Sequence, residues 1–222
     1  MQISKETVQI LKNFSGINSN LLFKPGNKLS TISPQKNVMA EVTVAETFPV
    51  EVGIYDLNKL LGLISEIDDP DVRFTDKSIV ICEGADGDNG VQLFASEPSL
   101  LTLPPEKKIS FPSPDVEFVL TGAVLTHIQR LASLLKATDV SFVGKDGQLW
   151  IHVSDLKNTS SDNYKKRIGE TDLSFRANIK IDNLKMIPQD YTVSISSKKI
   201  SRWVDMAGNM TVFVALEANS QF

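Results

Sequence analysis

The sequence predicts an α+β fold of two similar domains, each with antiparallel sheets backed by two helices. Three observations lead to this prediction. A proline-rich stretch divides the 222 residues into nearly equal halves. Each half begins with an amphipathic helical pattern behind a capping residue, and the remainder of each half consists of short alternating or β-branched segments typical of strands. Halves of about 100 residues are each long enough to bury a core.

The boundary between the domains follows from the distribution of proline. Four prolines lie within eleven residues, namely Pro104, Pro105, Pro112 and Pro114. Proline and the residue before it favour extended backbone, which excludes a helix. We therefore expect residues 104–114 to be a linker between an N-terminal domain, 1–103, and a C-terminal domain, 115–222.

The first domain is predicted to begin with a helix over residues 5–14, with Ser4 as its N-cap. At 100° per residue, one side of this helix gathers Ile3, Thr7, Ile10, Leu11 and Phe14, with Val8 at its margin. The other side carries Lys5, Gln9, Lys12 and Asn13. Because only one side is apolar, the helix is expected to pack on the domain with that side alone.

A matching pattern opens the second domain, where Thr121 is the expected N-cap of a helix over residues 122–137. Its apolar stripe is predicted to consist of Val124, Ile128, Leu131 and Leu135. The side chains expected to face away are Thr126, Gln129, Arg130, Ser133 and Lys136. This helix too is expected to pack with one side only.

A shorter element recurs in the two halves. Residues 54–60 resemble residues 180–186, because each segment contains an aspartate, Asp56 or Asp182, followed three residues later by a lysine. We interpret the aspartates as N-caps, which predicts a second helix in each domain. As a repeat the pattern is weak, since an aspartate and a lysine at this spacing are common by chance.

The rest of each half is predicted to form strands. In the first half they cover 38–44, 72–75, 78–82 and 91–95. In the second half they cover 116–120, 140–143, 148–153, 173–181, 191–196, 200–204 and 210–216. Residues 145–147 and 207–209 are expected to be hairpin turns. Sheets of this kind need the helices to cover one of their faces.

Composition excludes several classes of protein. Cys82 is the only cysteine and the chain has two histidines, so an internal disulfide is excluded and a zinc finger is not expected. No apolar run approaches the roughly 18 residues that cross a bilayer. The N-terminus lacks the apolar core of a signal peptide. We therefore expect a cytoplasmic protein with no membrane partner.

The sequence contains no recognisable motif for catalysis or phosphate binding. His127, on the shoulder of a predicted helix, and His152, in a predicted strand, are interpreted as structural or solvated residues. Residues 86–90 superficially resemble a calcium loop but lack the acidic residue that ends such a loop, so a hairpin loop is expected. These observations predict a protein that is not an enzyme and holds no metal.

The charge distribution leaves two interpretations open. The formal net charge of −4, from 23 basic and 27 acidic residues, excludes a generally basic coat for nucleic acid. Six basic residues lie in the four predicted helices: Lys5, Lys12, Lys59, Arg130, Lys136 and Lys185. Counting Glu6 and the two aspartate caps, the helices carry +3 and the remainder −7. Either the helix lysines form a solvated face, or the polar helix faces together meet a polyanion.

Several blocks of sequence, in order along the chain, carry a family resemblance. They are LKNF at 11–14, INS at 17–19, IYDLN at 54–58, LG at 61–62, KM at 185–186 with Pro188 and Tyr191, and VALEA at 214–218. In these blocks the chain resembles the sliding clamps of T-even-type phages, the processivity factors of the phage DNA polymerases. The stretches 24–50, 66–103 and 155–172 diverge from the family pattern.

The resemblance implies the DNA clamp fold and a homotrimeric ring whose helices line the central hole. The channel residues implied to face DNA are Lys5, Gln9, Lys12, Lys59, Arg130, Ser133, Lys136 and Lys185. Such a ring encircles duplex DNA without sequence specificity and tethers the replicative polymerase, with no catalytic residue and no cofactor. The implied partners are double-stranded DNA, further copies of the chain, DNA polymerase, a clamp loader and late-transcription factors, in the cytoplasm of the infected bacterial host.

The resemblance also implies how subunits and partners are held. Exposed sheet edges would pair head to tail between neighbouring subunits, and a hydrophobic pocket would capture short apolar C-terminal segments of partner proteins. The candidates for this pocket are Ile109, Phe111, Tyr191, Trp203 and Phe213. A position in the core is the competing interpretation for each of these residues.

Two other functions remain as alternatives. A β-rich phage adaptor or structural protein would keep the clamp fold without a DNA role, and it would be a monomer even at high concentration. An enzyme would need a pocket with paired ionisable groups, and no spacing in the sequence indicates one.

Overall fold

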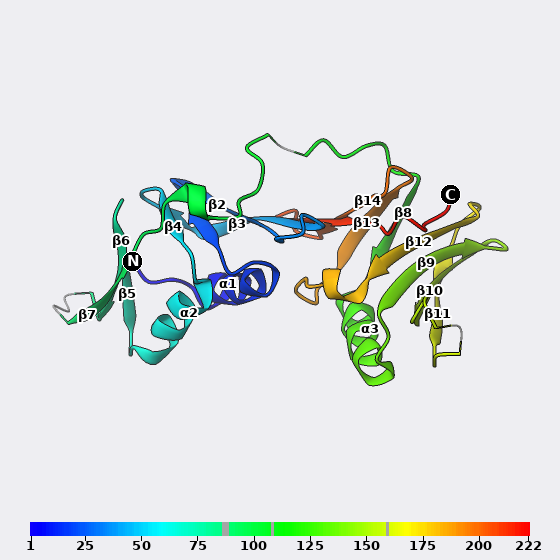
Figure 1. Ribbon diagram of the computed structural model, residues 1–222, viewed down its shortest axis with the longest axis horizontal. Coiled ribbons are helices and arrows are strands. Elements are labelled where there is room, and N and C mark those ends of the chain that lie inside the picture. The colour runs from blue at the N-terminus through cyan, green and yellow to red at the C-terminus, as the bar shows by residue number, and fades with distance from the viewer. Residues whose placement is uncertain (86–88, 108, 159) are drawn as a thin grey trace. The chain divides into compact units, whose positions relative to one another are not determined.

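The computed structural model describes residues 1–85, 89–107, 109–158 and 160–222, and it divides into two compact units, Met1–Lys107 and Lys108–Phe222 (Figure 1). Each unit combines helices with antiparallel strands, so the predicted α+β class is confirmed. The predicted hairpin loop at 86–90 and the predicted linker at 104–114 both contain residues that lie outside the described ranges.

Unit 1 begins with helix α1 (Lys5–Ile17), followed by strands β1 (Leu21–Phe23), β2 (Gly26–Ile32), β3 (Val38–Phe48) and β4 (Val52–Ile54). Helix α2 (Leu57–Glu66), strands β5 (Pro70–Phe74), β6 (Ser78–Glu83) and β7 (Gly90–Phe94), and the 3-10 turn η1 (Pro98–Leu100) complete it. Strand β1 pairs with β4, β2 pairs with β3, and β6 lies between β5 and β7.

The core of unit 1 lies between its strands and the buried sides of its two helices. Three aromatic rings, Phe23, Phe48 and Phe74, meet with centroids 4.9 to 5.3 Å apart. From α1, Leu11 and Phe14 are fully buried. Helix α1 packs on β2 and β3 and also contacts α2. Its opposite side is therefore left to solvent (Figure 1).

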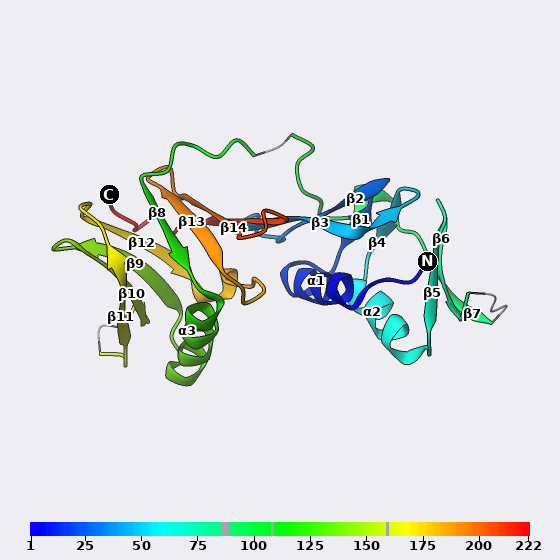
Figure 2. The same cartoon turned by 180° about the vertical axis from the view of Figure 1, so that it is seen from behind.

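Unit 2 contains strand β8 (Val116–Leu120), helix α3 (Gly122–Leu135) and strands β9 (Asp139–Lys145), β10 (Gln148–Ser154), β11 (Tyr164–Glu170) and β12 (Phe175–Lys180). The 3-10 turn η2 (Ile181–Asn183) leads to β13 (Tyr191–Ser196), β14 (Ile200–Asp205) and β15 (Met210–Ala215). One set of strands has the order β11-β10-β9-β12 and the other β15-β14-β13-β8. Figure 2, which views the structure from the opposite side, shows α3 beside these strands. Phe142, Tyr191 and Trp203 are fully buried at its core.

The prediction for α1 is confirmed in its cap and its buried side. The Ser4 hydroxyl accepts a hydrogen bond from the Thr7 backbone N–H, and the buried residues are Thr7, Ile10, Leu11, Phe14 and Ile17. The helix is one turn longer than predicted and ends at Ile17, because Asn18 leaves the helical conformation. Helix α2 also begins behind the predicted cap, where Asp56 accepts from the Lys59 backbone N–H.

The predicted apolar stripe of α3 is partly wrong. Ile128 is buried as expected, but its buried neighbours are Leu125 and Ala132, while Val124, Leu131 and Leu135 are only half-buried. Apolar side chains occupy a wide arc of this helix, so periodicity alone allows more than one orientation. Contact with β10 selects the orientation that buries Leu125.

The predicted second helix of the second domain is replaced by the single 3-10 turn η2. Asp182 lies inside this turn and does not cap it. Strand β12 continues to Lys180, and only seven residues separate it from Pro188, so little chain is left for a helix. The resemblance between residues 54–60 and 180–186 therefore does not extend to their secondary structure.

Among the predicted strands, β8 and β13 have the predicted bounds and the others differ by one to four residues at an end. The turn at 145–147 is confirmed, since Asp146 and Gly147 both have positive φ and join β9 to β10. Four strands were not predicted: β1, β2, β4 and β11. Strands β1 and β4 have three residues each, too few to show a period, and β11 is charged on both faces.

Candidate nucleic-acid interface

The basic side of α1 faces solvent because the first turn of the helix is fixed from the other side. Ser4 caps the helix, and Glu46 of β3 accepts hydrogen bonds from the Ser4 backbone N–H at 2.6 Å and the Thr7 hydroxyl at 2.5 Å. These contacts hold Thr7 against the strand. Lys5, Gln9 and Lys12 then lie on the exposed side.

Helix α2 adds one basic residue next to α1. Its buried residues are Leu57, Leu60, Leu61 and Ile64. Lys59 is exposed on the opposite side. Since α1 and α2 are in contact, their exposed sides form one continuous surface of unit 1.

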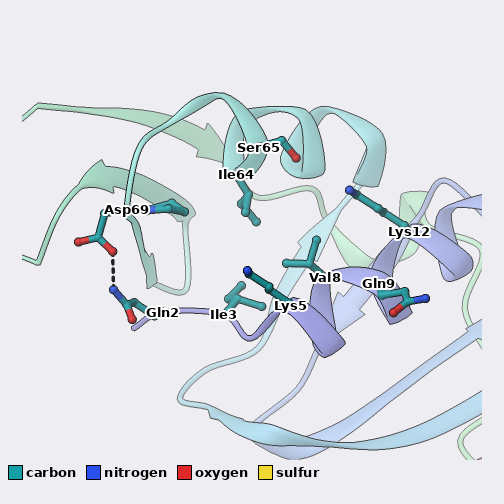
Figure 3. Close-up of a pocket in the computed structure, with 10 residues that line it drawn as sticks. Gln2, Ile3, Lys5, Val8, Gln9, Lys12, Ile64, Ser65 and Asp69 are labelled. Atoms are coloured by element: carbon teal, nitrogen blue, oxygen red, sulfur yellow. Dashed lines mark hydrogen bonds between the residues drawn. The ribbon is translucent and has the colours of Figure 1, made fainter.

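A groove lies between α1 and α2, with a volume of about 710 Å³. Ten residues line it: Gln2, Ile3, Lys5, Val8, Gln9, Lys12, Ile64, Ser65, Asp69 and Pro70. In Figure 3, the side chains of Lys5, Val8 and Lys12 extend from α1 toward α2, from which Ile64 projects. The Gln2 amide donates to Asp69 Oδ1 at 2.6 Å at the end of the groove nearest the N-terminus. The α1–α2 groove thus has apolar walls and two lysine ammonium groups.

In unit 2, α3 exposes Arg130 and Ser133, and the exposed Lys136 follows directly after the helix. These residues are three apart in sequence, so they follow one side of the helix. Lys136 is the C-cap, with a left-handed φ of 51°. Gln129 is instead turned toward the protein, where its amide donates to the Leu184 carbonyl at 2.9 Å.

The helical basic surface is smaller than the sequence predicted. Within the three α-helices of the described residues there are four basic side chains, Lys5, Lys12, Lys59 and Arg130, against Glu6 and Glu66. Lys185 is exposed but follows the turn η2 instead of lying on a helix. An excess of positive charge on the helices nevertheless remains, in a chain whose net charge is −4.

Two candidates for the partner pocket are core residues. Tyr191 and Trp203 have no exposed surface, and their rings contact each other edge to face. The Tyr191 hydroxyl donates to the Ile187 carbonyl at 2.8 Å, and burial raises the pKa of this phenol. The Trp203 indole donates to the Ser201 hydroxyl at 3.0 Å. Neither side chain is accessible to a partner, which corrects their assignment to a pocket.

The other pocket candidates lie nearer the surface of unit 2. Phe111 is half-buried, with its ring centroid 6.4 Å from that of Phe213, and the Arg202 guanidinium lies 4.8 Å from the Phe111 centroid. Ile109 is also half-buried. An aromatic surface next to a guanidinium suits an apolar segment with a polar end. The pocket formed by Ile109, Phe111 and Phe213 stays a prediction.

Cys82 and His127, which could in principle take part in catalysis or metal binding, lie in different units. Cys82 is buried in β6, and His127 contacts the edge of the Tyr164 ring. Within the described ranges, no three His, Cys, Asp or Glu side chains are grouped as a metal site would need. In the same part of the chain, no helix has the length and apolar character needed to span a bilayer.

Comparison with known proteins identifies clear similarities. Residues 4–93 match the family model for DNA polymerase processivity factors. The chain is 29% identical to the sliding clamp of Vibrio phage KVP40, over 98% of this chain and 100% of that protein. It is 28% identical to the sliding clamp of Enterobacteria phage T4, over 99% of this chain and 98% of that protein.

Solved structures show the same fold. Proliferating cell nuclear antigen from Entamoeba histolytica superimposes with a TM-score of 0.68 at 12% identity, covering 95% of this chain and 94% of that one. The protein of the same name from Thermococcus kodakaraensis gives a TM-score of 0.62 at 11% identity, covering 98% of both chains. The predicted clamp fold is therefore confirmed.

Proposed function

We propose that this chain is a sliding clamp and DNA polymerase processivity factor. It is similar over its full length to the sliding clamps of T-even-type phages. The observation that carries this proposal is that similarity over 98% or more of the chain coincides with the clamp fold. The fold alone would also suit a structural protein. The named relatives and the matching family model favour the replication role.

The clamp works by topology, so no bond is made or broken. Three copies close a ring around duplex DNA, and the ring leaves the duplex only by opening. Contacts to phosphates can then be few and screened by salt, which permits sliding without reading bases. Holding the polymerase on the ring keeps its effective concentration at the primer end high between catalytic cycles.

The DNA-facing residues in this proposal are Lys5, Gln9, Lys12, Lys59, Arg130, Ser133, Lys136 and Lys185. Their exposure supports the assignment, as does the position of most of them on the solvent sides of α1, α2 and α3. With a Debye length of about 8 Å at physiological ionic strength, only charges near the duplex act strongly on it. The acidic residues elsewhere then discourage DNA from binding outside the ring.

Ring closure is proposed to pair β7 of one copy with β11 of the next. Strand β7 ends the order β5-β6-β7, and β11 ends the order β11-β10-β9-β12, so among the described residues of its unit each has an edge with no partner strand. Strand β7 exposes Phe94, which is 76% accessible, and β11 carries three consecutive basic residues from Lys165 to Arg167. A head-to-tail contact of this kind closes after three copies.

The remaining parts of the assembly follow the same proposal. Residues 1–103 and 115–222 are the two clamp domains, joined by the linker 104–114. The polymerase, the clamp loader and late-transcription factors would place apolar segments against Ile109, Phe111 and Phe213. The protein would act in the cytoplasm of the infected bacterial host and carry out no catalysis.

The test is primer extension on a long template with cognate polymerase and loader. A variant with Glu at Lys5, Lys12, Arg130 and Lys136 is expected to lose stimulation of the polymerase while light scattering still reports a trimer. The matched control places Glu at Lys24, Lys77, Lys145 and Lys157, four exposed lysines outside the helices, and should keep stimulation. If the first variant still stimulates, the DNA-facing assignment is wrong. If the unmodified chain is a monomer at high concentration and does not stimulate, the adaptor alternative is favoured.

A further inference from the structure

A second pocket lies in unit 2, on the strands β10, β11 and β12 and the segment that follows β10. Its volume is about 310 Å³. The side chains that matter to its chemistry are His152, Ser154, Asp155, Asn163, Lys165 and Arg176. None of these residues belongs to the helix surfaces assigned to DNA.

Strand register brings the basic residues together. His152 of β10 is paired with Lys165 of β11 on one side and with Ser141 of β9 on the other. Ser141 is in turn paired with Asn178 of β12, and Arg176 lies two residues before Asn178 on the same face. Since directly paired residues point to the same face of a sheet, three basic side chains from three strands share this face.

The guanidinium of Arg176 is held in place by neutral groups. Its Nε donates to Asn178 Oδ1 and its Nη2 donates to the Ser141 hydroxyl, both at 3.3 Å. Among the described residues, neither Arg176 nor Lys165 forms an ion pair with a carboxylate. The Arg176 guanidinium is therefore held by neutral groups, and Lys165 has no carboxylate partner among the described residues.

Among the described residues that line the pocket, one is a carboxylate, and it already accepts a hydrogen bond. Asp155 Oδ1 accepts a hydrogen bond from the Lys157 backbone N–H at 2.9 Å. Lys165 and Arg176 carry two positive charges against this one negative charge, so the lining keeps an excess of positive charge. The pKa of His152 reflects this, because burial and the charges of Arg176 and Lys165 lower it to about 4.

We infer that this pocket binds a phosphate group, held by Lys165 and Arg176 with His152 and Ser154 as further hydrogen-bond donors. A guanidinium and an ammonium approaching from different strands match the several oxygens of a tetrahedral oxyanion. Neutral imidazole offers one N–H, and the Ser154 hydroxyl and Asn163 amide line the remaining wall. The net positive charge of the pocket disfavours a cation.

The two histidines of the chain make a direct NMR test possible, because His152 lies in the pocket and His127 lies on α3. Inorganic phosphate and, in a second arm, a deoxynucleoside triphosphate are titrated into the full chain at pH 7 and constant ionic strength. We expect a saturable shift of the His152 ring signals that is larger than any shift at His127. At saturating phosphate the pKa of His152 should rise by about one unit, since a nearby anion favours the charged imidazole.

Variants separate specific binding from screening. Lys165→Gln and Arg176→Gln should each weaken phosphate binding at least about tenfold, the loss of one strong charge-assisted contact. Lys166→Gln, which removes a charge from the adjacent, oppositely directed residue of β11, should leave binding unchanged. Should Arg176→Gln fail to fold, Lys165→Gln decides the question alone. An equal response to chloride, or phosphate binding that survives Lys165→Gln, would overturn the inference. If inorganic phosphate and the deoxynucleoside triphosphate bind with equal affinity, the site recognises a phosphate group only. If the triphosphate binds more tightly, the site recognises a nucleotide.

Discussion

The hydroxyl of Thr7 donates a hydrogen bond to Glu46 Oε2 at 2.5 Å, which joins the first turn of α1 to β3. The other carboxylate oxygen accepts the Ser4 backbone N–H at 2.6 Å. A helix N-terminus has backbone N–H groups without intrahelical partners, and its dipole favours a nearby negative charge. The buried Glu46 carboxylate supplies both a hydrogen-bond acceptor and that charge. The contact fixes the rotation of α1 and thereby turns Lys5 and Lys12 outward.

Replacing this carboxylate should destabilise unit 1. Glu46→Gln is expected to lower the free energy of unfolding by about 1.5–3 kcal/mol at pH 7, because two hydrogen bonds to a charged acceptor are weakened. Urea unfolding followed by circular dichroism measures the change. Glu41→Gln, on the same strand, is the control, since Glu41 makes no side-chain hydrogen bond with another described residue. Equal stability of the two variants would contradict the assignment.

The same carboxylate should make stability depend on pH in one direction. Burial would raise the pKa of Glu46, but hydrogen bonds from Thr7 and Ser4 outweigh it and hold the pKa below its ordinary value of 4.5. The native state then binds fewer protons here than the unfolded state, so the stabilisation is complete above pH 4.5 and is lost as pH falls through the native pKa. The stability gap between unmodified protein and Glu46→Gln should therefore narrow below pH 4.5. A gap that stays constant with falling pH would show that Glu46 does not carry this linkage.

An ion pair between a half-buried lysine and a buried aspartate should stabilise unit 2. Asp139 is 1% exposed, and its Oδ1 lies 2.5 Å from Lys180 Nζ. Burial would raise the pKa of Asp139, but hydrogen bonds from Lys180, the Thr138 hydroxyl and the Leu156 N–H keep it below the ordinary value. Lys180→Met removes the charged donor and is expected to cost about 1.5–3 kcal/mol, measured by urea unfolding. Lys145→Met, at the exposed end of β9, should cost far less.

Two glycines should respond oppositely to alanine. Gly62 lies in α2, where an added Cβ meets nothing within 4 Å, so Gly62→Ala should raise stability by about 0.5–1 kcal/mol. At Gly144 of β9, an added Cβ would strike the Leu173 carbonyl and come within 2.6 Å of the Phe175 ring. Gly144→Ala should therefore destabilise the protein. Thermal unfolding of both variants checks the signs, and a stabilised Gly144→Ala would mean that β9 and its neighbour are not packed as described.

The single thiol should report on the integrity of unit 1. Cys82 is 3% exposed in β6, so a thiol reagent should react with it slowly in the native protein and at once in urea. Absorbance at a fixed reagent concentration measures the two rates. A native rate equal to the unfolded rate would place Cys82 at the surface.

Local sequence predicted the elements whose signals are local. The cap and buried side of α1 follow from Ser4 and a narrow apolar stripe, and the bounds of β8 and β13 follow from alternation. Predictions from sequence were wrong where one residue pattern is compatible with more than one helix orientation or secondary structure. The wide apolar arc of α3 allowed the wrong stripe, and Asp182 looked like a cap although strand β12 occupies the residues before it.

The two sites illustrate the same division. Sequence periodicity found Lys5, Gln9 and Lys12, but Ile64 and Asp69 join them in the groove only because α1 packs on α2. His152, Lys165 and Arg176 are far apart in sequence and meet through strand register, which no local pattern encodes. The sequence leaves both a pocket and the core open for Tyr191 and Trp203, and the packing of unit 2 buries both.

The amino-acid sequence by itself determined the α+β class, the capped helices and the basic character of their polar sides, because these depend on residues a few positions apart. Only the tertiary structure decided which face of α3 is buried, which aromatics form the core and which charged side chains share a pocket. Those choices depend on contacts between distant segments, where shape, burial and strand pairing select one of several arrangements that the local pattern allows.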